Sequence, residues 1–411
     1  MILALEMFRS IPRYAVARAA LGRMPGLLVG PMAPLRLVTR DEPEIRRPGW
    51  VKVRPLLSGI SGAEVRAVTG STSLYFSALV SMPFVPGREV VGEPGRRLRG
   101  PAARHPRGHR PGAALRRPRH RAVRVVRLGA DQPLRPRDRR QACRRACRPA
   151  SAATPAAAGA SGSPPTARSL HVVPDDLPDE RAVLVEPAAV AVNVARRAEV
   201  PDGGSVLVSG AGTTGLLTVL ALRELTNAGR ITVIAKHPRQ AELALRFGAS
   251  DVARPGEALR AVRRTSRALQ VGPRDLPAPA QRVAGAGEML FGGVDVAVDT
   301  AGTTESTDTV LRSTRAGGRV VLSGMPSGAD LSPAWVRELE VVGAYASHGD
   351  AFDVATQAGG RLAARGRGRR TLPAAPLARG HRPRAPGGPA RHRQGLLRRP
   401  EQRMSSRRRT S

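Results

Sequence analysis

Lysine is nearly absent from this chain of 411 residues: only Lys52 and Lys236 occur among its 67 basic residues. Acidic residues number 32, so the net charge of +35 comes almost entirely from arginine. A charge of this size normally indicates a nucleic-acid or anionic-membrane partner, and such basic surfaces usually combine both cations. The near absence of lysine argues against an ordinary nucleic-acid-binding surface.

Aromatic residues are also scarce, and none of the 11 lies between Phe84 and Phe247 or after Phe352. Residues 94–168 and the C-terminal part consist mainly of Arg, Pro, Ala and Gly, without a hydrophobic period. Such segments bury too little apolar surface to offset the entropy of ordering. We expect residues 94–168 and an Arg/Pro-rich tail over 351–411 to be disordered.

Two explanations fit these arginine-rich blocks: an arm that binds nucleic acid, or GC-rich coding DNA translated out of frame. Read one base later through GC-rich synonymous codons, residues 120–135 become IEPCASCASGRTNLC, which is typical of a zinc-binding loop. The same offset turns residues 391–402 into GTVKVCFDVRN, typical of an amphipathic strand. Nucleic-acid-binding arms usually contain lysine, and single-strand binders add stacking aromatics. We therefore favour frame disruption and expect no nucleic-acid partner.

Cysteine is limited to Cys143 and Cys147, both inside an arginine-rich block. A zinc site needs about four ligands on ordered turns, and two cysteines in so long a chain argue against a disulfide scaffold. No apolar run reaches the roughly 18 residues that span a bilayer. We interpret residues 1–34 as a surface extension, although their arginine-bearing start is similar to a transit peptide. These features predict a soluble cytoplasmic protein with no membrane partner.

A glycine motif, residues 210–215, follows a short apolar run and precedes an apolar helical pattern over 216–225. Gly210 permits a tight turn, Gly212 lets the backbone approach a pyrophosphate, and Gly215 lets the helix pack closely on the strand. The free N–H groups and the dipole at the helix N-terminus favour an anion. The motif therefore predicts a dinucleotide site formed by Gly210, Gly212, Thr213, Thr214 and Gly215.

The next strand, predicted over 231–234, ends without the acidic residue that an NAD site usually places there for the ribose 2′-hydroxyl. Lys236 and Arg239 follow instead. Cations suit a 2′-phosphate, so we expect NADP rather than NAD. A solvated helix start is the alternative interpretation of these two side chains.

Further strand patterns occur at 293–299, 318–324 and 339–345. Alternation of such strands with helices predicts a doubly wound parallel α/β sheet. Small residues at strand carboxyl ends suit the place where such sheets bind ligands. The cofactor-binding set then extends to Ala301, Gly302, Ser323 and Gly324.

Together these motifs resemble the medium-chain dehydrogenase/reductase family, the zinc-dependent alcohol and polyol dehydrogenases. The likeness covers about residues 35–92 and 170–356. It implies a GroES-like β-rich domain over 35–185, partly disrupted, followed by a Rossmann domain over 186–350. Two segments match motifs of the family: Ser58–Glu64 is similar to G-I-C-G-[ST]-D, and Pro86–Gly92 is similar to P-G-H-E-x-x-G. Further matches are Val185–Pro187, the Gly210 turn and Asp299–Gly302.

The resemblance also shows departures at the family's catalytic zinc site. Its zinc thiolate and relay hydroxyl fall at Ser61 and Ala63, and its zinc-binding His falls at Arg88. Glu89 and Glu186 remain as candidate metal ligands, and Ser61 and Glu89 as candidate catalytic residues. Since an arginine cannot ligate zinc and its charge opposes the metal, we expect zinc to be absent or weakly held. Pairing of these carboxylates with arginine is the competing interpretation.

The resemblance implies an NAD(P)-dependent oxidoreductase that transfers a hydride between a small alcohol or polyol and the nicotinamide. Its nucleotide-binding half is intact in sequence, and its catalytic half is damaged. The alternatives are a pseudoenzyme that binds dinucleotide without turnover, and an arginine-rich nucleic-acid-binding protein. The sequence does not determine the oligomeric state, and a homo-oligomer is one of the alternatives. Tyr75, Phe76 and Phe84 are candidates for either a substrate pocket or the core.

Overall fold

The computed structural model describes residues 1–7, 10–20, 33–45, 52–73, 82–94, 121–125, 170–174, 176–266, 268–272, 289–325, 328–347 and 350–357. All of them lie in the first of the chain's two units, Met1–Arg367 and Gly368–Ser411. Cys143, Cys147, Tyr75 and Phe76 lie outside the described residues, as do most of the two segments predicted to be disordered.

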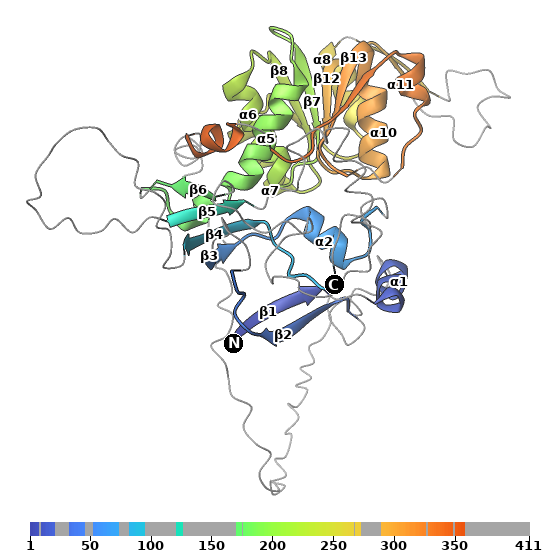
Figure 1. The fold of residues 1–411 in the computed structure, drawn as a ribbon. Coiled ribbons are helices and arrows are strands. Elements are labelled where there is room, and N and C mark those ends of the chain that lie inside the picture. Colours follow the sequence, from blue (N-terminus) through green and yellow to red (C-terminus); the bar gives the residue numbers. More distant parts are fainter. Residues whose placement is uncertain are drawn as a thin grey trace, which may run out of the picture. The chain divides into compact units, whose positions relative to one another are not determined.

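A sheet of six strands in the order β14-β13-β12-β7-β8-β9 dominates the second half of the chain (Figure 1). All its pairings are parallel. The chain runs outward from β7 through β8 and β9, and then outward on the other side from β12, so the topology switches between β7 and β12. The predicted doubly wound α/β fold is confirmed. The strands are β7 (Ser205–Ser209), β8 (Arg230–Ile234), β9 (Asp251–Ala253), β12 (Val294–Asp299), β13 (Thr314–Leu322) and β14 (Glu340–Gly343).

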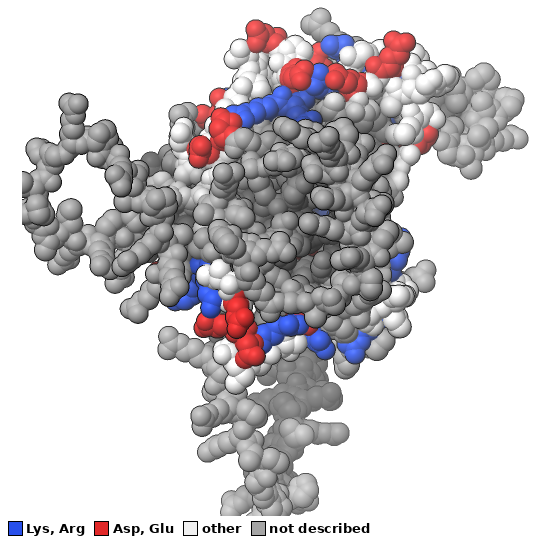
Figure 2. Space-filling model, viewed as in Figure 1, with Lys and Arg blue, Asp and Glu red and all other residues white. Residues whose placement is uncertain are grey.

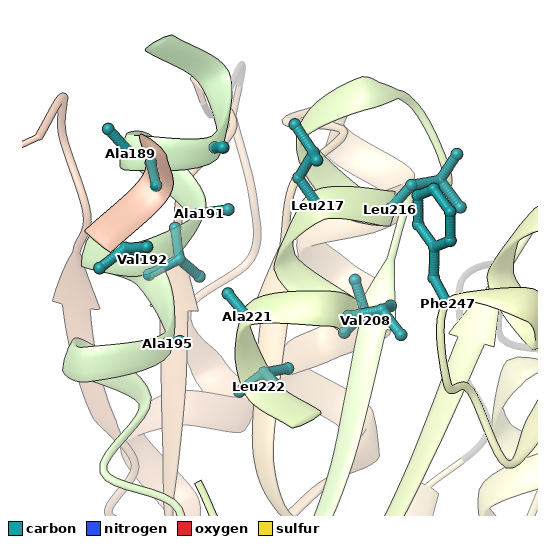
Figure 3. Packing of buried hydrophobic residues seen from close by; sticks show 14 of the residues in the cluster. Ala189, Ala191, Val192, Ala195, Val208, Leu216, Leu217, Ala221, Leu222 and Phe247 are labelled. Atoms are coloured by element: carbon teal, nitrogen blue, oxygen red, sulfur yellow. The ribbon is translucent and has the colours of Figure 1, made fainter. Parts of the chain in front are cut away.

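Helices cover both faces of this sheet because successive strand side chains point to opposite sides. Val206 and Val208 pack in one core cluster with α5, α6 and α7, whereas Leu207 packs in a second with α8 and α10. Small side chains on α5, such as Ala191 and Ala195, let it lie against α6 (Figure 3). These helices are α5 (Val185–Ala198), α6 (Thr213–Leu225), α7 (Pro238–Arg246), α8 (Ala258–Ser266) and α10 (Thr304–Ser313).

The first half of the chain holds a four-stranded antiparallel sheet in the order β3-β4-β5-β6. Its strands are β3 (Val53–Ser58), β4 (Glu89–Pro94), β5 (Arg121–Val125) and β6 (Leu170–Val173). The strand β5 corrects the prediction that residues 94–168 lack regular structure. Its short Ala-Val pattern suits a strand, and pairing with both β4 and β6 satisfies its backbone groups.

Residues 1–34 are not simply a surface extension, which corrects the sequence interpretation. Strand β1 (Ile2–Met7) pairs antiparallel with β2 (Leu35–Arg40), and helix α1 (Ile11–Ala20) follows β1. The buried Met7 exchanges backbone hydrogen bonds with Phe84, which is itself buried. Phe84 therefore contributes to the core.

Residues 351–357 also differ from the prediction, which placed them in the tail. They form a helix with Ala351, Phe352 and Ala355 buried, and the Phe352 ring stacks on His171 at 4.3 Å between centroids. None of the helices that the structure describes has the length and apolar character needed to cross a bilayer. The remaining elements are α2 (Gly62–Val68), α4 (Asp179–Ala182), β10 (Leu269–Val271), β11 (Met289–Phe291) and α11 (Ser332–Val336).

Candidate functional site

The loops after β7, β8, β12 and β13 leave the same end of the parallel sheet. We call these loops, residues 210–215, 235–239, 300–302 and 323–325, the carboxyl edge. The topological switch between β7 and β12 lies within it, and ligands of such sheets bind at that point. The structure thus brings the predicted cofactor-binding residues onto one edge of the sheet.

The three glycines of the turn after β7 differ in what surrounds them. Gly210 has a φ of +104°, a conformation that side chains rarely adopt. A Cβ added to Gly215 would lie 1.9 Å from the Gly210 carbonyl oxygen, whereas one added to Gly212 would meet nothing within 4 Å. The fold itself therefore requires glycine at 210 and 215. At Gly212 it does not, and the open space lies at the N-terminus of α6.

Asp299 fixes the two neighbouring loops of the carboxyl edge. Its buried carboxylate accepts hydrogen bonds from the N–H groups of Ala301 and Gly302 at 3.0 and 2.9 Å, and from the Thr307 hydroxyl at 2.7 Å. The Asp299 carbonyl accepts from two further backbone N–H groups, at 2.9 and 2.8 Å, from Ser323 and Gly324. One residue at the end of β12 thus orders the loops after both β12 and β13.

The Thr300 hydroxyl links the loop after β12 to the glycine turn. It lies 3.0 Å from the carbonyl oxygens of both Ser209 and Gly210. The Ser323 hydroxyl, by contrast, is buried without a hydrogen-bond partner in the described part of the chain. A buried orphan hydroxyl is costly, and its place on the carboxyl edge is compatible with a polar ligand there.

The loop after β8 presents cations to solvent. Lys236 and Arg239 are exposed on either side of His237, which precedes the first turn of α7. Neither cation makes a hydrogen bond or ion pair with the residues that the structure describes. Thr213 is exposed and Thr214 half-buried at the start of α6. These donors leave room for an anion.

A second cluster lies where β4 meets the start of α5. Arg88 Nε is 3.7 Å from Glu186 Oε1, and this nitrogen has no hydrogen-bond partner among the described residues. Burial, followed by repulsion from Glu186, raises the pKa of Glu89 to about 7. Burial also raises the pKa of Glu186, against the attraction of Arg88. Gly59 packs against Glu89, since a Cβ there would lie 2.1 Å from its Oε2.

Ser61 is buried and begins α2 as its N-cap. Its N–H donates to Glu64 Oε2 at 2.6 Å, and its hydroxyl accepts from the Glu64 N–H at 3.4 Å. This reciprocal pair is a capping box, which stabilises the first turn of a helix. Ser61 therefore has a structural task as well as its predicted catalytic one.

This cluster does not fit a zinc ion. Among the described residues, no three His, Cys, Asp or Glu side chains gather closely enough to hold a metal. The guanidinium of Arg88 lies 3.7 Å from Glu186, and it cannot act as a ligand. Ser61 replaces the expected thiolate with a hydroxyl, a weak ligand in this set.

Comparison with known proteins finds relatives of the second half of the chain. Residues 213–359 match the model of the zinc-binding dehydrogenase family. The chain is 31% identical over 198 residues to the L-idonate 5-dehydrogenase of Vitis vinifera, covering 45% of this chain and 49% of that protein. It is 32% identical over 176 residues to the sorbitol dehydrogenase of Arabidopsis thaliana, covering 42% and 43%. Residues 213–359 thus carry a zinc-binding dehydrogenase domain, and the matched part of the chain is similar to polyol dehydrogenases of the medium-chain dehydrogenase/reductase type. It spans about half the length, or less, of these curated relatives.

Solved structures of dehydrogenases show the same fold at low identity. The alcohol dehydrogenase of Aeropyrum pernix aligns with a TM-score of 0.59 and 18% identity over 89% of this chain and 90% of that one. The galactitol-1-phosphate dehydrogenase of Escherichia coli aligns with a TM-score of 0.52 and 17% identity over 80% and 86%. These likenesses establish the two-part architecture, a Rossmann domain preceded by a GroES-like part, and nothing about the substrate.

The sequence pointed to most of the carboxyl edge and missed the residues that organise it. Asp299 and Thr300 entered only as part of a family motif, although they form the hydrogen bonds that shape the loops. Arg66 was not predicted at all, yet it contacts the carboxyl edge. No sequence signal identifies it, because its partners lie more than 230 residues away.

Proposed function

We propose that this chain is a protein of the medium-chain dehydrogenase/reductase type and binds a nicotinamide dinucleotide at the carboxyl edge. The observation that carries the proposal is Gly212, because the fold does not need a glycine there but a pyrophosphate on the N-terminus of α6 does. Thr213, Thr214 and the α6 N–H groups would hold the pyrophosphate. Ala301, Gly302, Ser323 and Gly324 would border the nicotinamide end.

We propose NADP rather than NAD, since Lys236 and Arg239 are exposed cations at the end of β8. The experiment is titration of the full chain with NADPH and with NADH, followed by nicotinamide fluorescence. Replacing both cations with alanine is expected to weaken NADPH binding about tenfold and to leave NADH binding unchanged. Equal losses for the two nucleotides would contradict the preference, and no binding of either would overturn the dinucleotide site.

The activity that this site supports best is oxidoreduction of a small alcohol or polyol. The nicotinamide would supply hydride transfer when bound. Glu89 can hold or release a proton near neutral pH because its pKa is raised to about 7. Ser61 and Glu89 are the groups proposed to face the substrate. The polyol class rests on the relatives, which include an L-idonate and a sorbitol dehydrogenase.

The Arg88–Glu186 ion pair favours a second candidate, a dinucleotide-binding protein without turnover. Since the pair stands where the family binds zinc, we propose that neither Glu89 nor Glu186 holds a metal. Elemental analysis of the purified protein, together with an alcohol-dependent assay of nicotinamide reduction, separates the two candidates. Turnover without zinc supports the oxidoreductase, and NADPH binding without turnover supports the second. Stoichiometric zinc that Glu89→Gln removes would contradict the metal-free site.

A nucleic-acid-binding function finds little support in the charge distribution. Outside residues 94–168 and 358–411, Lys and Arg exceed Asp and Glu by only 2. On the described part of the face in Figure 2, basic and acidic side chains are interspersed rather than gathered into a basic patch. Most of the net positive charge thus lies in residues 94–168 and 358–411, the segments that we interpret as translated out of frame.

A further inference from the structure

Helix α2 reaches the carboxyl edge through a single arginine. The Arg66 Nη1 atom donates to the carbonyl oxygens of Gly302 and Met325, at 3.1 Å each, and Nη2 donates to the carbonyl oxygen of Ala301. These acceptors belong to two separate loops, one after β12 and one after β13. A planar guanidinium can engage several carbonyls at once in a fixed geometry.

Asp299 binds the same two loops as a hydrogen-bond acceptor, whereas Arg66 binds them as a donor. The Gly302 N–H donates to the Asp299 carboxylate, while the Gly302 carbonyl accepts from Arg66. The loop after β13 follows the same scheme, because the Gly324 N–H donates to the Asp299 carbonyl and the Met325 carbonyl accepts from Arg66. Asp299 thus binds the donors of both loops, and Arg66 binds their acceptors.

Hydrogen bonds hold both ends of α2 to the first half of the chain, from the Gly59 N–H to the Glu89 carbonyl and from Arg18 to the Gly70 carbonyl. Within the helix, however, Arg66 alone reaches the carboxyl edge in the described part of the chain. The helix is seven residues long and has no buried residue. Beyond its end, the Ser73 N–H lies 3.4 Å from Met325 Sδ, a weak acceptor. Its first turn carries Ser61 as the N-cap, and Arg66 lies five residues further on. Arg66 is therefore the direct hydrogen-bond link between the helix that Ser61 begins and the carboxyl edge.

We propose that Arg66 is a positioning residue that couples helix α2, and with it Ser61, to the nucleotide-binding loops. This proposal rests on the proposed dinucleotide site for its functional meaning. Binding of a nucleotide orders the carboxyl edge, and Arg66 transmits that order to α2. The coupling is reciprocal, so loss of Arg66 weakens nucleotide binding and frees α2 at the same time.

Hydrogen–deuterium exchange of the full chain, with and without NADPH, tests the coupling. In the wild type, NADPH is expected to slow exchange in both residues 62–68 and residues 213–215. In Arg66→Ala, NADPH still slows exchange in 213–215 but no longer in 62–68, and the NADPH Kd rises about tenfold. Arg66→Lys keeps the charge without the planar fork and gives an intermediate result. A control, Arg196→Ala, breaks an exposed arginine ion pair with Asp350 and leaves both readouts unchanged.

Failure of this proposal is distinguishable from failure of the proposed function. If the wild type does not bind NADPH, the dinucleotide site is wrong, but exchange without nucleotide still tests Arg66. Arg66→Ala should then speed exchange in residues 62–68 and in residues 300–303 together. Unchanged exchange in either segment, or unaltered protection of 62–68 by NADPH in the variant, would overturn the proposal. Arg66→Lys keeps the test available if Arg66→Ala does not fold.

Discussion

Two alanine substitutions in the glycine turn separate what the fold requires from what a ligand requires. A Cβ at position 215 would lie 1.9 Å from the Gly210 carbonyl oxygen, where ordinary contact begins at 3.4 Å, so the backbone must move by about 1.5 Å. Overpacking of this kind typically costs 1–3 kcal/mol or more, and alanine returns about 1 kcal/mol of helix propensity. We expect Gly215→Ala to lower the free energy of unfolding by about 2 kcal/mol.

Gly212→Ala is the matched control, with the opposite expectation. Gly212 has a φ of −74°, which alanine adopts freely, and no atom lies within 4 Å of the added Cβ. Its effect on stability should stay within about 0.5 kcal/mol. The methyl group would occupy the space proposed for the pyrophosphate, so the NADPH Kd should rise at least about tenfold.

Urea unfolding followed by circular dichroism gives the stability of both variants, and nicotinamide fluorescence gives the affinity. The comparison is informative because the two changes are chemically identical and lie three residues apart. Wild-type affinity in Gly212→Ala would refute a pyrophosphate at this helix N-terminus. Wild-type stability in Gly215→Ala would refute the close packing of α6 on the glycine turn.

Three further predictions concern single residues. Asp299→Ala should lower the free energy of unfolding by about 3 kcal/mol, because buried N–H groups lose a charged acceptor; a urea midpoint equal to that of the wild type would contradict this role. Because the pKa of Glu89 in the folded state is about 7, against an ordinary 4.5, the native state binds this proton more tightly, and stability falls by about 3 kcal/mol as the pH rises from 4.5 to 7. In EDTA-containing buffer, Glu89→Gln should remove this decrease in the free energy of unfolding. If the variant keeps the full pH dependence, another group causes it. Arg223→Ala should speed exchange around Gly248 and Ala228, whose carbonyls Arg223 binds at 2.7 and 2.6 Å, without changing NADPH affinity; a change in affinity would show that these distant loops affect the site.

By itself the sequence determined the Rossmann half, because its signals are local. Apolar runs of strand length, a glycine turn and amphipathic helices each depend on neighbouring residues, and β7, α6 and β8 appear where those patterns predict them. Local patterns gave wrong predictions for two elements near the arginine-rich segments. Strand β5 lies in an arginine-rich block, where pairing with β4 and β6 stabilises it. The helix over 351–357 lies next to the arginine-rich tail, and burial of Phe352 against distant partners stabilises it.

Tertiary structure alone decided which groups act together. It paired Arg88 with Glu186 and set Glu89 in a buried place that raises its pKa, neither of which spacing can show. It also brought Arg66 to carbonyl oxygens more than 230 residues away. Side-chain hydrogen bonds and desolvation depend on distance in space, and the sequence gives distance only along the chain. The glycine turn and its neighbouring strands could therefore be predicted from the sequence. The carboxylate cluster and the contact of α2 with the carboxyl edge could not.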